Sequence, residues 1–159
     1  MPYRNIKSID IRNNRVNELP DEICSLQNLT QMKLDYNYLQ ALPFSLGSLK
    51  SLVSISASQN RLLQLPDSLF HKESQLHTLL VNDNKISVVQ KGLGKLVHLK
   101  TLFLHNNLIV EIPLSLSQLT KLTEFSLDWL LYIEEKKSVM TTFDPDHITN
   151  DKQGRPSER

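Results

Sequence analysis

Apolar residues recur along this chain at a fixed set of spacings. The first copy of the pattern combines apolar residues with one asparagine and one proline, at Ile6, Ile9, Ile11, Asn14, Val16, Leu19, Pro20 and Ile23. Four further copies begin at Leu29, Leu52, Leu76 and Leu99. A sixth begins at Leu122 and breaks where Leu130 replaces the asparagine. The five full copies are 23, 23, 24, 23 and 23 residues long and cover residues 6–121. Such repetition indicates a solenoid, in which each repeat buries its apolar face against its neighbours.

Within each repeat, the fourth and sixth positions are apolar and their neighbours are mostly polar. This alternation has period two and predicts a short strand with one buried face. One strand per repeat should give a parallel sheet with strands about 4.8 Å apart. The predicted strands are Ser8–Ile11, Gln31–Leu34, Ser54–Ala57, Thr78–Val81, Thr101–Leu104 and Glu124–Leu127.

The Leu-Pro-x-x-Leu segment that ends most repeats should return the chain along the other side of the stack. Proline lacks an N–H and fixes φ, so an irregular or 3₁₀ conformation is expected there rather than a long helix. Because the return side is longer than the strand side, the stack should curve with its sheet on the concave face.

One polar column runs through the apolar template, at Asn14, Asn37, Asn60, Asn84 and Asn107. A carboxamide has donors and an acceptor, so it can bond to turn backbone groups that a tight bend leaves without partners. We interpret this column as a structural ladder rather than a catalytic one.

Two irregularities interrupt the template. The third repeat has one extra residue, so residues 70–74 should bulge on the convex side. The fourth repeat has Gln90 in place of proline and carries the pair Gly92 and Gly94, which predicts a bend or a local kink.

With this template and its Leu-Pro-x-x-Leu ending, the sequence resembles the leucine-rich-repeat family. The 23-residue form is similar to that of Ras-suppressor-like and plant Ras-group-like intracellular repeat proteins, and the resemblance covers about three quarters of the chain. It implies an α/β leucine-rich-repeat solenoid, a curved right-handed horseshoe arc with a parallel concave sheet and a mostly irregular or 3₁₀ convex side. It also implies a non-enzymatic protein-interaction module or scaffold, acting in intracellular signalling.

The variable strand positions should point out of the concave sheet and form the binding surface. Leu80 and Phe103 occupy the same column in adjacent repeats and predict an exposed apolar pair. Four residues should supply polar and aromatic surroundings: Tyr36, Asp83, His105 and Trp129. Charge is graded along the face, with Lys7, Arg12 and Lys33 at one end and Glu124 and Asp128 at the other.

The pattern divides the chain into two parts. Residues 1–140 should form the repeat domain, with a partial repeat and a helical cap over 122–140, and 141–159 should form a polar tail or linker. Only five residues precede Ile6, too few for a cap. The chain is therefore expected to be part of a longer solenoid, or to meet a partner at that edge.

Composition narrows the classes of partner. Eighteen Lys plus Arg balance 17 Asp plus Glu, which gives no general attraction to nucleic acid. The longest apolar run, residues 129–133, is far shorter than the roughly 20 residues of a membrane span. Cys24 is the single cysteine and no signal-peptide pattern is present, so a cytoplasmic, intracellular location is expected. The triplet Asn28-Leu29-Thr30 matches a glycosylation site and favours the opposite compartment.

The sequence also lacks the patterns of a chemical site. Its four glycines do not have the spacing of a phosphate loop, and its five histidines are spread over different parts of the repeat. We expect no catalytic, cofactor-binding or metal-ligating residues, and a protein partner whose identity the residues do not specify. Two alternatives stay open: a recognition fragment of a larger repeat-containing phosphatase, kinase or GTPase, and a structural component of a cytoskeletal assembly.

Overall fold

The computed structural model describes residues 5–128 and contains six short strands. They are β1 (Ser8–Asp10), β2 (Gln31–Lys33), β3 (Ser54–Ser56), β4 (Thr78–Leu80), β5 (Thr101–Phe103) and β6 (Glu124–Ser126). All six predicted strands are confirmed, and each ends one residue earlier than predicted. The residue after the strand still pairs: the N–H of Ile11 donates to the Lys33 carbonyl at 3.0 Å. The chain begins its turn at that residue.

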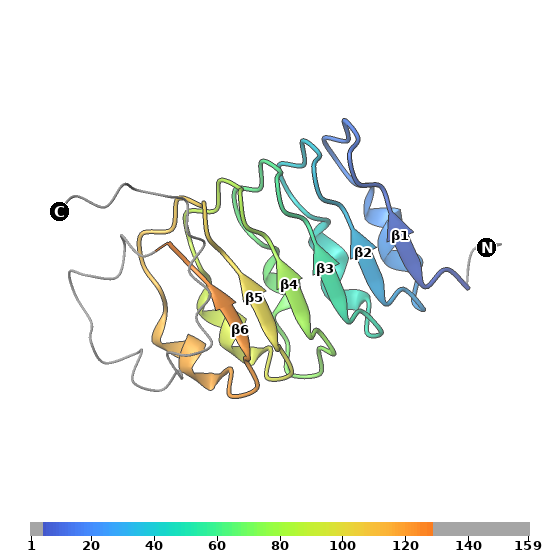
Figure 1. Cartoon of the computed structure of the whole chain (residues 1–159). Helices are drawn as coiled ribbons and strands as arrows, with labels where there is room; N and C mark the ends of the chain where they lie inside the picture. Colours follow the sequence, from blue (N-terminus) through green and yellow to red (C-terminus); the bar gives the residue numbers. More distant parts are fainter. Residues whose placement is uncertain (1–4, 129–159) are drawn as a thin grey trace.

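The six strands form one parallel sheet in chain order, from β1 to β6. Figure 1 shows them side by side, with the return segments behind them. The register stacks the fourth template residue of every repeat in one column: Ile9, Met32, Ile55, Leu79, Leu102 and Phe125. The middle residue of β2 to β5 is fully buried, because successive side chains of a strand point to opposite faces.

The return side carries five short 3₁₀ helices. They are η1 (Asp21–Ser25), η2 (Phe44–Ser48), η3 (Asp67–Leu69), η4 (Lys91–Lys95) and η5 (Leu114–Gln118). Each follows an extended residue, which is proline in four repeats and Gln90 in the fourth. The predicted 3₁₀ return is confirmed.

The core lies between the sheet and the return segments, and its composition follows the template. Leu29, Leu39 and Leu46 are completely buried, and their equivalents in the third to fifth repeats are at most 3% exposed. In the first repeat, by contrast, Ile9 and Ile11 are only partly buried against this core. The architecture is the predicted leucine-rich-repeat solenoid, with its sheet on the concave face.

The asparagine column joins successive repeats. The amide nitrogen of Asn60 donates to the carbonyl of Leu34 in the preceding repeat at 3.0 Å and to that of Ala57 in its own repeat at 3.2 Å. Its oxygen accepts from the Leu39 N–H at 3.0 Å. Asn37, Asn84 and Asn107 repeat this arrangement.

The residue before each asparagine has a left-handed backbone, with φ between 54° and 58°. These residues are Asn13, Tyr36, Gln59, Asp83 and Asn106. None is glycine, although this region of φ disfavours most side chains. In the second to fifth repeats, the following asparagine holds the turn in place through hydrogen bonds to the backbone of its own repeat and of earlier ones.

The predicted bend at the two glycines of the fourth repeat is wrong, because η4 has the same five-residue length as η1, η2 and η5. The glycines instead meet neighbouring return segments. A Cβ on Gly92 would lie 2.9 Å from the Cβ of Phe70, and one on Gly94 would lie 2.2 Å from the Ser115 carbonyl oxygen. Gly47 shows the same closeness, with 1.8 Å to the Ser68 carbonyl oxygen.

The predicted bulge at residues 70–74 is only partly correct. Lys72 and Glu73 are exposed, as a bulge requires. Phe70 and Ser74 at its two ends are buried, at 4% and 6% exposure. The extra residue is accommodated by a shorter η3, and Phe70 packs into the core.

Candidate functional site

The concave face carries the first and third residues of each strand, because the middle residue points into the core. In β4 and β5 the third residues are Leu80 and Phe103, and the register places them opposite each other. Both are half-buried. Ser56 of β3 and Ser126 of β6 flank them in the same row. The row therefore has an apolar centre between two serines.

His105 extends this centre beyond the end of β5. Its ring lies 5.9 Å from that of Phe103, at an angle of 53°. Its Nδ1 lies 2.8 Å from the Ser126 hydroxyl, within hydrogen-bonding distance. The imidazole thus places a polar edge beside the apolar pair.

A row of hydrogen bonds follows the edge of the sheet at which the strands end. It begins at Asp35, whose carboxylate accepts from the Ser56 hydroxyl at 2.5 Å and from the Ser58 N–H at 2.9 Å. The Ser58 hydroxyl donates to the side-chain oxygen of Asn82 at 2.6 Å. These bonds connect the second, third and fourth repeats.

The row continues to the sixth repeat. Both Asn82 and Asn106 donate to the carboxylate of Asp83, at 2.6 and 2.9 Å. The Asn106 N–H donates to Asp128 at 3.0 Å. Among the described residues, no cationic side chain lies within ion-pair distance of Asp35, Asp83 or Asp128. This edge therefore presents fixed negative charge.

The charge gradient expected along the face is changed by one ion pair. Arg12 bonds to Asp10 through two nitrogens, at 2.9 and 2.7 Å. The hydrogen bond from Arg12 lowers the pKa of Asp10 to about 2, so the carboxylate stays charged and matches the guanidinium. Asp35 and Asp83 also place negative charge in the middle of the stack. The charge of the face therefore does not change steadily from the first repeat to the sixth.

The structure brings together four of the six predicted binding residues. Leu80, Phe103, His105 and Asp83 lie on the fourth and fifth repeats. Tyr36 is 58% exposed and lies two repeats from Asp83, or about 10 Å at the usual strand spacing. Trp129 and the helical cap beyond residue 128 lie outside the described residues, as does the tail at 141–159.

The hydrogen-bonded row was not predicted from the sequence. Its members belong to the seventh and eighth template positions and change identity from repeat to repeat. A partial signal exists at the eighth position, where Asn13, Asp83 and Asn106 are residue types that tolerate a left-handed backbone.

The four histidines within residues 5–128 do not converge on a shared ligand. The ring of His77 stacks on His98 at 6.2 Å rather than meeting His105. Within residues 5–128, no three His, Cys, Asp or Glu side chains are grouped so that they could hold a metal ion.

Cys24 is buried in η1 at 5% exposure. Burial raises the pKa of its thiol to about 11, with a smaller contribution from Asp21. The thiolate is the reactive form of cysteine, so this side chain is poorly suited to nucleophilic chemistry. At this buried position Cys24 acts as a small apolar side chain that fills space in the core.

In the part of the chain that the structure describes, no helix has the length and apolar character needed to cross a membrane.

Solved structures with the same architecture include several receptors. A leucine-rich-repeat protein of Leptospira interrogans aligns with a TM-score of 0.69 and 26% identity, over 78% of this chain and 33% of that one. The ectodomain of the Arabidopsis thaliana membrane receptor kinase GASSHO1/SCHENGEN3, in complex with CASPARIAN STRIP INTEGRITY FACTOR 2, gives 0.72 and 25%, over 79% and 16%. The Drosophila Toll–Spatzle complex gives 0.71 and 27%, over 79% and 18%. The chain spans a third or less of each of these proteins.

A search of curated proteins found no match to this sequence. The family model described as "Leucine rich repeat" matches residues 4–62 and 74–129, which together make up more than half of the chain. On this match and on the sheet, ladder and return segments described above, the chain belongs to the leucine-rich-repeat family.

Proposed function

We propose that this protein binds a partner protein on its concave face, with Leu80 and Phe103 as the apolar centre of the interface. The adjacency of these two half-buried side chains in register carries the proposal. Apolar groups surrounded by polar ones are typical of protein interfaces. Binding energy usually concentrates in a few such side chains near the centre.

The hydrogen-bonded row from Asp35 to Asp128 would border this centre. Its side chains are held by bonds to one another and to backbone N–H groups, so little side-chain entropy is lost when a partner docks. Its negative charge would select cationic groups on the partner and favour their approach. The similarity to receptors solved with a bound partner, such as GASSHO1/SCHENGEN3 and Toll, supports the use of this fold for binding.

We further propose an intracellular compartment and a role in signalling. The support for the intracellular compartment is a single, buried cysteine, which leaves the chain without an internal disulfide. The triplet at Asn28 offers a direct test: glycosidase treatment of the native protein should leave its mass unchanged. A mass shift that Asn28→Gln abolishes would place the protein in the secretory route and overturn this part of the proposal.

The binding proposal is tested by affinity capture with the full chain, followed by titration of the captured partner. Phe103→Ala should weaken binding by about 2 kcal/mol, or roughly 30-fold, and Leu80→Ala should weaken it in the same direction. Leu63→Ala is a matched control, because Leu63 is 55% exposed on the return side. Circular dichroism should first show that each variant is folded. Unchanged affinity for both concave variants would move the interface to another surface.

A further inference from the structure

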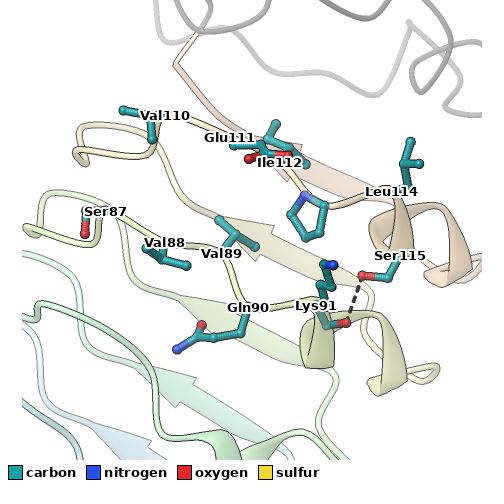
Figure 2. Close-up of a pocket in the computed structure, with 11 residues that line it drawn as sticks. Ser87, Val88, Val89, Gln90, Lys91, Val110, Glu111, Ile112, Leu114 and Ser115 are labelled. Atoms are coloured by element: carbon teal, nitrogen blue, oxygen red, sulfur yellow. Dashed lines mark hydrogen bonds between the residues drawn. The ribbon is translucent and has the colours of Figure 1, made fainter.

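A groove lies between the return segments of the fourth and fifth repeats, away from the concave sheet. Its volume is about 550 Å³, and its walls are residues 87–91 and 110–115. Figure 2 shows Val88 and Val89 on one wall and Val110 and Leu114 on the other. A volume of this size lies within the range of ligand-binding clefts.

The groove exposes apolar groups that the first repeat does not have. Val88, Val110 and Leu114 are 58%, 75% and 60% exposed. The equivalent template positions in the first repeat are all polar: Glu18, Asn17 and Asp21. The template itself therefore does not require apolar side chains here, and their exposure is unfavourable unless another surface covers them.

The two walls of the groove differ in charge, because Lys91 lies on the fourth-repeat wall and Glu111 on the fifth-repeat wall. Residues 85–95 contain three lysines, Lys85, Lys91 and Lys95, and no acidic residue. The side chain of Lys91 extends into the space between the two walls (Figure 2). Within the described residues, no carboxylate lies at ion-pair distance from it. A ligand with an acidic group would provide that partner.

We propose that this groove binds a segment of a second protein that carries a large apolar side chain next to an acidic residue. The apolar side chain enters between Val88, Val110 and Leu114, and the carboxylate pairs with the Lys91 ammonium. Peptide segments are bound in this way when pockets select side chains and a fixed charge selects the register. The groove and the concave face are separate surfaces, so the protein can hold two partners, or two parts of one partner.

The test is selection of a random peptide library on the full-length chain, followed by titration of the enriched peptides. The expected sequences combine a large apolar residue with Asp or Glu within two positions. Lys91→Glu and Leu114→Ser should each weaken their binding at least about tenfold, since both remove a contact that the peptide requires.

Two matched controls separate the groove from general surface effects. Lys72→Glu makes the same charge change at an exposed site of the third repeat. Phe44→Ser removes an exposed apolar group at the template position of Leu114, in the second repeat. Both should leave affinity within about twofold.

Three results would overturn the proposal. The first is an absence of enriched peptides, or enrichment without acidic residues. The second is equal weakening by the groove variants and the controls. The third is dimerisation in sedimentation experiments that Leu114→Ser abolishes, because the groove would then be a contact between two copies of this chain.

Discussion

The first and third repeats follow one template in different surroundings. Ile9 and Ile55 hold the same position, yet Ile55 is completely buried and Ile9 only partly. Asn60 bonds to two repeats, whereas Asn14 donates only to the carbonyls of Ile11 and Arg12 in its own repeat. Each asparagine reaches back to the repeat before it, and no repeat precedes the first within residues 5–128.

The difference shows where the stability of the stack resides. The same residue type contributes more to the stability of the fold when a neighbouring repeat covers it. Most of the stability therefore comes from the interfaces between repeats. Matched substitutions in the two repeats can measure this contribution directly.

The largest effect is expected in the strand column. Ile55→Ala should lower the free energy of unfolding by about 2–5 kcal/mol, because it leaves a cavity in a fully buried layer. Ile9→Ala removes the same atoms from a partly solvated site and should have less than half of that effect. Chemical denaturation of both variants measures the difference, and equal losses would show that the first layer is as well packed as the interior.

The asparagine ladder should give a smaller difference in the same direction. Asn60→Leu should reduce stability by about 1–3 kcal/mol, because the Leu39 N–H and the Leu34 carbonyl lose their partner in a buried site. Asn14→Leu should reduce it by less than about 1 kcal/mol, since water can replace its bonds at an exposed position. Denaturation midpoints at a constant m-value provide the comparison. A neutral Asn60→Leu would mean that the ladder contributes no net stability.

The smallest effect concerns the left-handed turns. Gln59→Asn should raise stability by less than about 1 kcal/mol, because asparagine tolerates φ near 56° better than glutamine. The reverse change, Asn13→Gln, should lower stability slightly at the equivalent turn. Thermal unfolding resolves such a pair when both variants are measured together. Shifts of the same sign would show that side-chain contacts, not backbone preference, control these turns.

Much of the fold could be predicted because each signal is local and repeated. Alternation around Ile55 identifies a strand, and proline at position 66 marks the start of a 3₁₀ turn. The apolar pair at Leu80 and Phe103 followed from counting along the template, which fixes the register between strands.

Features that depend on unlike residues in neighbouring repeats could not be predicted in this way. The row through Asp35, Ser58 and Asp83 forms only when three repeats are stacked, and the residue type at its template positions changes from repeat to repeat. Gly92 suggested a bend because glycine commonly marks one. The side chain that leaves room only for glycine at this position is that of Phe70, which lies 22 residues earlier in the chain.

The contacts across the return side have a consequence for the order of the repeats. Gly47 meets Ser68, Phe70 meets Gly92, and Gly94 meets Ser115, so a small residue faces a larger one at each of these junctions. A chain rebuilt with the third and fourth repeats exchanged would set Phe70 against Ser115, where the native neighbour is a glycine. The strands follow one template, so their contacts would be similar in either order of the repeats. The contact between Phe70 and Gly92 on the convex side therefore determines which repeat can follow the third, and the third repeat could be transplanted only together with the fourth.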